Sequence, residues 1–151
     1  MPRRFEYHLP HPGIRALRDL EAYIHRCSLE PPLLELVKMR ASQINGCAFC
    51  LDMHSQDARV AGETEQRVYV LDAWREAPFY SERERAALAW TEAVTRVADT
   101  HVPDEIYDHA TQHFNEHELL DLTLAITAIN SWNRLAISSR MEAGSYQPQV
   151  T

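Results

Sequence analysis

The segment Cys47-Ala48-Phe49-Cys50-Leu51-Asp52-Met53-His54 places two thiols three residues apart and an imidazole four residues after the second thiol. In a helix, residues three or four positions apart lie on the same face, so these three side chains would be neighbours. Two such thiols can form a disulfide, and a nearby base can convert one of them to a thiolate. The segment therefore predicts a helix that carries either a thiol redox site or half of a zinc site.

The residues around this segment set the limits of the predicted helix. Asn45-Gly46 is a typical helix stop and turn, and Ala61-Gly62 would end the next helix, which we expect from about 47 to 60. Proximity to a helix N-terminus favours a thiolate at Cys47, because unpaired amides and the helix dipole stabilise negative charge there. His54, four residues after Cys50, favours that thiol instead, since its ring can accept the proton.

Helical periodicity dominates the whole chain, which contains 4 glycines and little strand-like alternation. The pattern predicts one all-α domain of six or seven helices over residues 1–151. The other helices are expected at 14–24, after Glu30-Pro31-Pro32, after Thr64, after a capping box at Ser81 to Glu84, from Pro103, and after a cap signal that begins at Asn115. Residues 119–137 are apolar nearly all round, which indicates burial in the domain centre or in a subunit interface.

Bulk properties narrow the class of protein. The formal net charge is -7 and no basic run exceeds Arg3-Arg4, so nucleic acid is not expected as a partner. No apolar run approaches the roughly 20 residues of a membrane span, and the N-terminus has no apolar segment typical of a secretory signal. We therefore expect a cytoplasmic protein without a membrane anchor. A close pair among only 3 cysteines is then expected to be catalytic or metal-binding.

A zinc site is the alternative interpretation of the cysteine pair. Structural zinc normally takes four ligands, with a second closely spaced pair of Cys or His residues. The third cysteine, Cys27, stands alone and is expected to be a small buried apolar residue. Four histidines lie in a polar stretch and are predicted to be surface residues: His101, His109, His113 and His117. The pattern favours redox chemistry, with a non-enzymatic zinc-binding or redox-sensing module as the alternative.

The string from Gln43 to His54 resembles the core motif of the alkylhydroperoxidase D (AhpD) / carboxymuconolactone decarboxylase family. In that motif a glutamate lies twelve residues before a Cys-x-x-Cys pair, and a histidine follows four residues after it. Glu35 occupies the glutamate position here. The resemblance covers about residues 15–140. It implies an AhpD-like helical fold, a thiol-dependent alkyl hydroperoxide reductase with an antioxidant role, and a homo-oligomer, either a trimer or a hexamer.

The resemblance also implies a role for each motif residue. Cys50 would be the thiol that attacks the hydroperoxide, and Cys47 the thiol that resolves the product. Glu35 and His54 would form a proton relay, through a water molecule, that deprotonates Cys50. The implied partners are a hydroperoxide and a dithiol electron donor such as a lipoyl protein. No Gly-rich phosphate-binding loop is present in the sequence, so no nucleotide cofactor is expected.

Three further expectations concern the surroundings of the motif. Phe49 stands where the family pattern has a tyrosine, and we expect it to pack on the far side of the helix from the thiols. Glu35 is expected to be buried, which would raise its pKa and make it a proton carrier near neutral pH. A polar cluster in the last helix is predicted to line the site or a subunit contact: Asn130, Trp132, Asn133 and Arg134.

Overall fold

The all-α prediction is confirmed by the computed structural model, which describes residues 1–150 and contains no strand within them. The helical elements are α1 (Pro12–Arg26), α2 (Pro31–Asn45), α3 (Ala48–Val60), α4 (Glu65–Tyr69), a 3₁₀ turn η1 (Leu71–Ala73), α5 (Glu82–Thr95), α6 (Val97–Thr100), α7 (Asp104–Thr111) and α8 (Glu116–Ser139).

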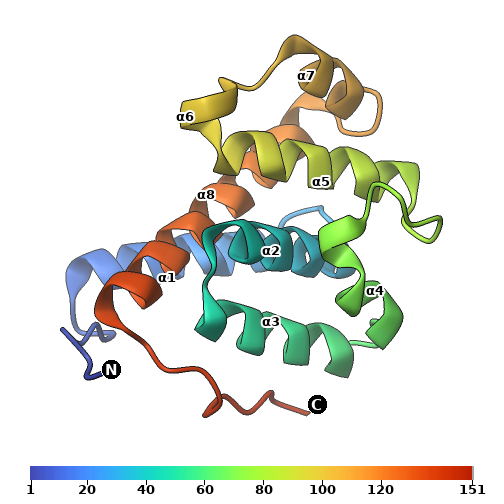
Figure 1. The fold of residues 1–151 in the computed structure, drawn as a ribbon. Coiled ribbons are helices and arrows are strands. Elements are labelled where there is room, and N and C mark those ends of the chain that lie inside the picture. Colours follow the sequence, from blue (N-terminus) through green and yellow to red (C-terminus); the bar gives the residue numbers. More distant parts are fainter. Residues whose placement is uncertain (151) are drawn as a thin grey trace.

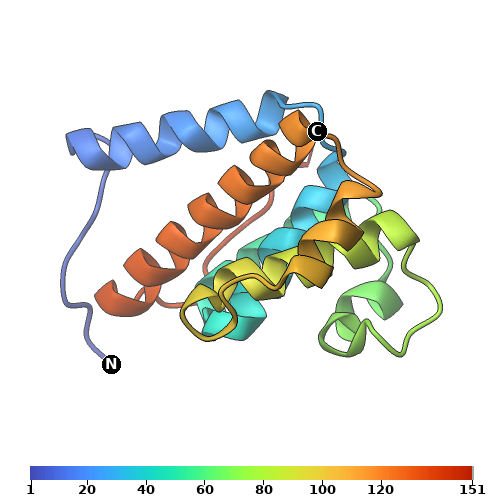
Figure 2. The ribbon, with the colours of Figure 1, turned by 90° about the horizontal axis from the view of Figure 1, so that it is seen from above.

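Helix α2 lies at the centre of the arrangement. It packs against α3, α5 and α8, and Figure 1 shows it between α3 and α5 while α8 crosses behind. Seen from above in Figure 2, α1 runs beside α8. The central position explains why nine of the fifteen residues of α2 are buried. The helix that carries the motif glutamate, Glu35, is thus fixed on several sides.

Most predicted helix starts coincide with observed caps. Ser81 and Asn115 each form a capping box, with Glu84 and Glu118 respectively, and so begin α5 and α8. Pro103 is the N-cap of α7 rather than its first helical residue. Eight α-helices are present in residues 1–150 instead of six or seven because the short α6 follows α5 as a separate turn.

The segment after Thr64 is less regular than its periodicity predicts. Helix α4 ends at Tyr69 and the chain continues as η1. The guanidinium of Arg85 donates hydrogen bonds to the backbone oxygens of Trp74, Arg75 and Ala77 just beyond. A tertiary contact thereby satisfies carbonyls that a longer helix would have paired internally.

Helix α8, with 24 residues, is the longest helix. Its residues Leu122 and Ile126 are fully buried, which confirms the expected central position. Leu120 and Ile137, however, are 56% and 46% exposed, so the helix is apolar on its outer side as well. No helix within residues 1–150, α8 included, is long and apolar enough to cross a membrane.

A buried ionic network holds α2 against α5. Arg40 Nε donates to Glu92 Oε1 at 2.9 Å, and Trp74 Nε1 donates to the same oxygen at 2.9 Å. Arg75 pairs with Glu92 Oε2 at 2.6 Å. Burial raises the pKa of Glu92, but the hydrogen bonds from Trp74 and Arg75 and the charge of Arg40 outweigh it, so the pKa is lowered overall.

We expect Glu92→Gln to lower the free energy of unfolding at neutral pH by about 3 kcal/mol, because Arg40 keeps its burial but loses an ionic partner. The folded-state pKa of Glu92 is lowered, so its stabilisation is complete above the unfolded-state pKa of about 4.3 and disappears as the pH falls through the folded-state pKa. The difference from wild type should therefore shrink in acid. Urea unfolding at a series of pH values measures it. Glu76→Gln, at an exposed position, is the control, and a pH-independent difference would contradict this account.

Candidate active site

The α2–α3 hairpin positions the motif residues. Helix α2 ends at Asn45, and its C-cap Gly46 has a φ of +69°, in the left-handed region that glycine adopts without strain. The Gly46 N–H donates to Gln43 O, and the Cys47 N–H donates to Ser42 O at 3.0 Å. The chain thereby reverses within two residues and begins α3 at Ala48. This turn places the end of α2 beside the start of the cysteine-bearing helix.

The two motif cysteines are joined as a disulfide, with Cα atoms 5.4 Å apart. Cys47 is the N-cap of α3, and its sulfur accepts a hydrogen bond from the Cys50 N–H at 3.4 Å. Each cysteine is 1% exposed. The predicted placement of Cys47 at a helix N-terminus is thus confirmed, and the hairpin holds the pair in its disulfide form.

His54 and Glu35 meet across the hairpin. His54 Nδ1 lies 3.1 Å from Glu35 Oε2, and the His54 side chain is 9% exposed. A carboxylate at Nδ1 favours the tautomer in which Nδ1 carries the proton. Nε2 is then the ring nitrogen that can accept a proton from another group. Glu35 lies twelve residues before Cys47, and His54 lies seven residues after it. This spacing brings an acid–base pair together from two helices.

The expected rise in the pKa of Glu35 is wrong. Burial does raise the pKa of this carboxyl, but the hydrogen bond with His54 and the positive charges of His54, Lys38 and His25 outweigh it. The pKa of Glu35 is therefore lowered, and the side chain, 17% exposed, is a carboxylate at neutral pH. It is suited to orient His54 and to stabilise its charged form, rather than to carry a proton itself.

A cavity of about 380 Å³ lies against this cluster, and Cys50, His54 and Glu35 line it. Cys47 is absent from the residues that line it, so Cys50 is the cysteine of the pair that borders the cavity. The expectation that Phe49 lies on the far side of the helix is wrong, since it lines the same cavity and packs against the cysteine cluster. Phe49 lies at the start of α3, where Trp132 of α8 and Met141 pack against the same cysteine cluster.

Lys38 is a residue of this cavity that the sequence analysis missed. It is 2% exposed, and its Nζ donates to Glu21 Oε1 of α1 at 2.7 Å. A charged residue in a helix is normally expected to face solvent. A buried ion pair such as that of Lys38 with Glu21 is therefore not predicted from the sequence. One signal was available: Lys38 follows Glu35 by three residues, so the two side chains share a helix face.

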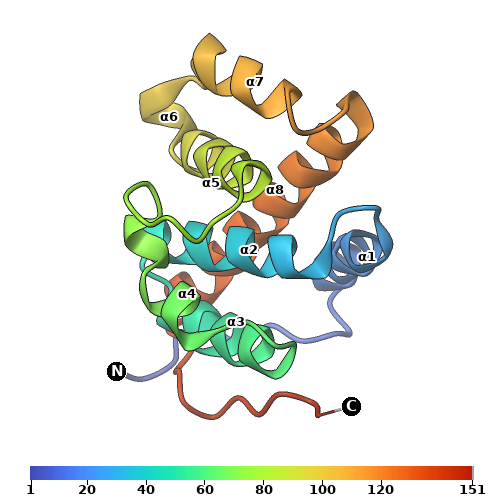
Figure 3. The ribbon, with the colours of Figure 1, turned by 90° about the vertical axis from the view of Figure 1, so that its right-hand side faces the viewer.

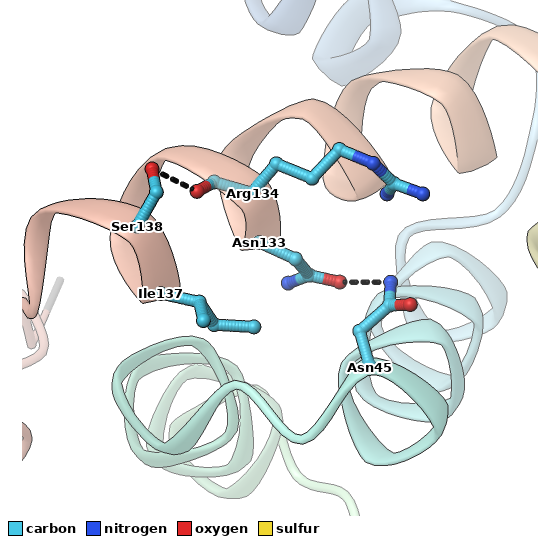
Figure 4. Close-up of a pocket in the computed structure, with 5 residues that line it drawn as sticks. All are labelled: Asn45, Asn133, Arg134, Ile137 and Ser138. Atoms are coloured by element: carbon cyan, nitrogen blue, oxygen red, sulfur yellow. Dashed lines mark hydrogen bonds between the residues drawn. The ribbon is translucent and has the colours of Figure 1, made fainter.

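The polar cluster of α8 divides into different roles. Trp132 lines the cavity that contains Cys50. Asn45 donates to the side-chain oxygens of Asn130 and Asn133, both at 2.9 Å, which ties the end of α2 to α8. Figure 4 shows Asn45 and Asn133 at a second cavity, of about 420 Å³, together with Arg134. That cavity is lined by no cysteine or histidine.

Cys27 and the four histidines predicted to be surface residues lie outside the site. Cys27 is free and partly buried rather than fully buried, and packs against the core between α1 and α8. His101 and His117 are exposed as expected, whereas His109 and His113 are partly buried and stack edge to face. Over residues 1–150, no three His, Cys, Asp or Glu side chains form a group that could hold a metal ion.

The sequence profile of the carboxymuconolactone decarboxylase family matches residues 13–93, which is more than half of the chain. The chain belongs to this family. The matched residues include Glu35, Cys47, Cys50 and His54. The family match therefore includes the α2–α3 hairpin and the motif residues that it positions.

Two relatives of this family member align with nearly its whole length. It is 46% identical to the uncharacterized protein YdfG of Bacillus subtilis (strain 168), covering 96% of this chain and 99% of YdfG. A solved structure from Agrobacterium tumefaciens, a protein of unknown function provisionally assigned as the antioxidant defence protein AhpD, superimposes with a TM-score of 0.91 at 41% identity, over 96% of this chain and 100% of that one. The debrominase Bmp8, at 22% identity and a TM-score of 0.78 over 87% of this chain and 70% of its own, shares the fold.

Proposed function

We propose that this member of the carboxymuconolactone decarboxylase family is a thiol-dependent hydroperoxide reductase. The observation that carries the proposal is the position of Cys50. It is paired with Cys47, faces a cavity, and lies one helical turn before a histidine that is hydrogen-bonded to a carboxylate. A dithiol with a base can reduce a peroxide, whereas a dithiol alone supports only thiol exchange. The kinship with the AhpD-assigned structure from Agrobacterium tumefaciens agrees with this chemistry.

The proposed reduction of a hydroperoxide proceeds in three steps. The Cys50 thiolate attacks one oxygen of the hydroperoxide ROOH, the O–O bond breaks, and the products are Cys50 sulfenic acid and ROH once the alkoxide is protonated. The Cys47 thiol then attacks the Cys50 sulfur, releasing water and forming the disulfide. A dithiol donor, such as a lipoyl group, finally reduces this disulfide and is itself oxidised. Two electrons pass from the donor to the hydroperoxide.

His54 and Glu35 supply the proton chemistry. Nε2 of His54 accepts the Cys50 proton, and the resulting imidazolium is stabilised by the Glu35 carboxylate at Nδ1. The imidazolium then returns the proton to the departing alkoxide. Glu35 keeps its negative charge throughout, in line with its lowered pKa.

The proposal is tested by counting thiols across one turnover. Fully reduced protein should present three free thiols, from the 3 cysteines of the chain, and one equivalent of tert-butyl hydroperoxide should leave a single free thiol, that of Cys27. One equivalent of the alcohol should form in the same experiment. Protein alkylated before the addition is the control. Three thiols remaining after the addition would contradict the proposal. Stoichiometric zinc, in protein purified without added metal, with both motif thiols protected from alkylation, would support the metal-binding alternative instead.

A further inference from the structure

A wall of the cavity comes from outside the helices. Residues 140–150 follow α8 and run beneath α3, as Figures 1 and 3 show from two directions. Two contacts fasten this segment to α3. The Gly144 N–H donates to Asp52 Oδ2 at 2.8 Å, and the Tyr146 hydroxyl donates to Asp57 Oδ1 at 2.7 Å. The helix that carries Cys50 is therefore also the helix that holds this segment.

The start of the segment is fixed as well. Arg140 ends α8 in the left-handed region, with a φ of 60°, and the Met141 N–H donates back to Ala136 O at 2.9 Å. Near the other end of the chain, the Tyr7 hydroxyl donates to Met141 Sδ at 3.0 Å. Tyr7, Met141 and Tyr146 all line the cavity that contains Cys50. This cavity wall thus consists of two chain segments joined to each other and to α3.

The hydrogen bond of Tyr146 persists at neutral pH. Burial, the hydrogen bond to Asp57 and the negative charges of Asp57 and Glu35 raise the pKa of Tyr146 to about 12. The phenol therefore stays protonated and remains a donor to Asp57. The residue is partly buried and lines the cavity.

Resting on the proposed function, we propose that Tyr146 determines substrate specificity by limiting the size of the organic group on a hydroperoxide that can reach Cys50. Phe49, Met53 and Trp132 supply apolar surface to the same cavity, which suits a compact apolar group. A bulky group has to displace the Tyr146 ring and break its bond to Asp57. The substrate class is therefore small organic hydroperoxides, with fatty acid hydroperoxides disfavoured.

The first test compares two substrates. For Tyr146→Ala, the ratio of kcat/KM for linoleic acid hydroperoxide to that for tert-butyl hydroperoxide should rise about tenfold over wild type. Tyr69→Ala, at a position that is 74% exposed, should leave the ratio unchanged. Tyr146→Phe keeps the ring but loses the bond to Asp57, and a smaller rise is expected. An equal loss of activity toward both substrates in Tyr146→Phe would overturn the proposal in favour of a chemical role for the hydroxyl.

The second test does not depend on peroxidase activity. In a Cys27→Ser/Cys47→Ser background, Cys50 is the only thiol, and its alkylation can be timed with iodoacetamide and with the much larger N-(1-pyrenyl)maleimide. Tyr146→Ala should raise the rate with the large reagent about tenfold relative to the small one. A shifted alkylation ratio, combined with a wild-type protein that reduces no hydroperoxide, would uphold the wall and reject the proposed function. An unchanged ratio in both tests would overturn the wall itself.

Discussion

Cys50→Ser is expected to abolish hydroperoxide reduction down to the rate without protein, while Cys47→Ser is expected to retain a single turnover. The difference follows from the geometry, because only Cys50 of the pair lines the cavity. A serine hydroxyl does not form the anion that attacks the O–O bond at neutral pH. Without Cys47, the sulfenic acid on Cys50 has no neighbouring thiol to condense with.

The measurement is hydroperoxide consumption with an excess of a dithiol donor, together with a burst assay without donor. Cys47→Ser should give a burst of one equivalent per chain and a sulfenic acid that dimedone traps at Cys50. Cys27→Ser is the matched control, since Cys27 is a free cysteine outside the site, and it should behave as wild type. Full steady-state activity in Cys50→Ser would refute the mechanism. A burst in Cys50→Ser, with the sulfenic acid trapped at Cys47, would exchange the roles of the two thiols.

His54→Asn is expected to lower kcat/KM for tert-butyl hydroperoxide by about 10²–10⁴-fold, the usual contribution of a positioned acid–base group. Asparagine keeps a polar group against Glu35 but cannot accept a proton from Cys50. The pKa of the Cys50 thiol should then rise toward the value of about 8.5 of an ordinary cysteine. The loss of activity should accordingly be smaller at alkaline pH, where Cys50 ionises without assistance.

The pH dependence of iodoacetamide alkylation, in the background with Cys50 as the only thiol, measures this pKa directly. His109→Asn serves as the control because His109 lies on α7 and is absent from the cavity lining. The expected pattern is a low pKa in the parent protein and in the control, and a raised pKa in His54→Asn. An ordinary pKa in all three proteins would show that His54 does not activate Cys50.

Local sequence signals predicted the helices that build the site. The left-handed turn at Gly46 and the capping boxes at Ser81 and Asn115 depend on nearby residues, so their outcome can be read from the sequence. The break after Tyr69 could not be read in this way. The chain beyond this break is held by a distant residue, since Arg85 binds the carbonyls of Trp74, Arg75 and Ala77.

The site was predictable where a motif fixes the spacing, and not where distant segments meet. The contact between Glu35 and His54 follows from the family spacing and the hairpin. The sign of the pKa shift of Glu35 did not follow, since it is set by competition between burial and several charges. Tyr146 was out of reach for a different reason: its partner Asp57 lies 89 positions away, and no helical period links them.

The position of Cys50 alone on the cavity side of the disulfide has a kinetic consequence. On the proposed mechanism, the oxidant and the electron donor both react at the same sulfur through the same entrance. They must therefore alternate, which is the condition for ping-pong kinetics. The two substrates then compete for one entrance, so a surplus of either one slows the half-reaction of the other.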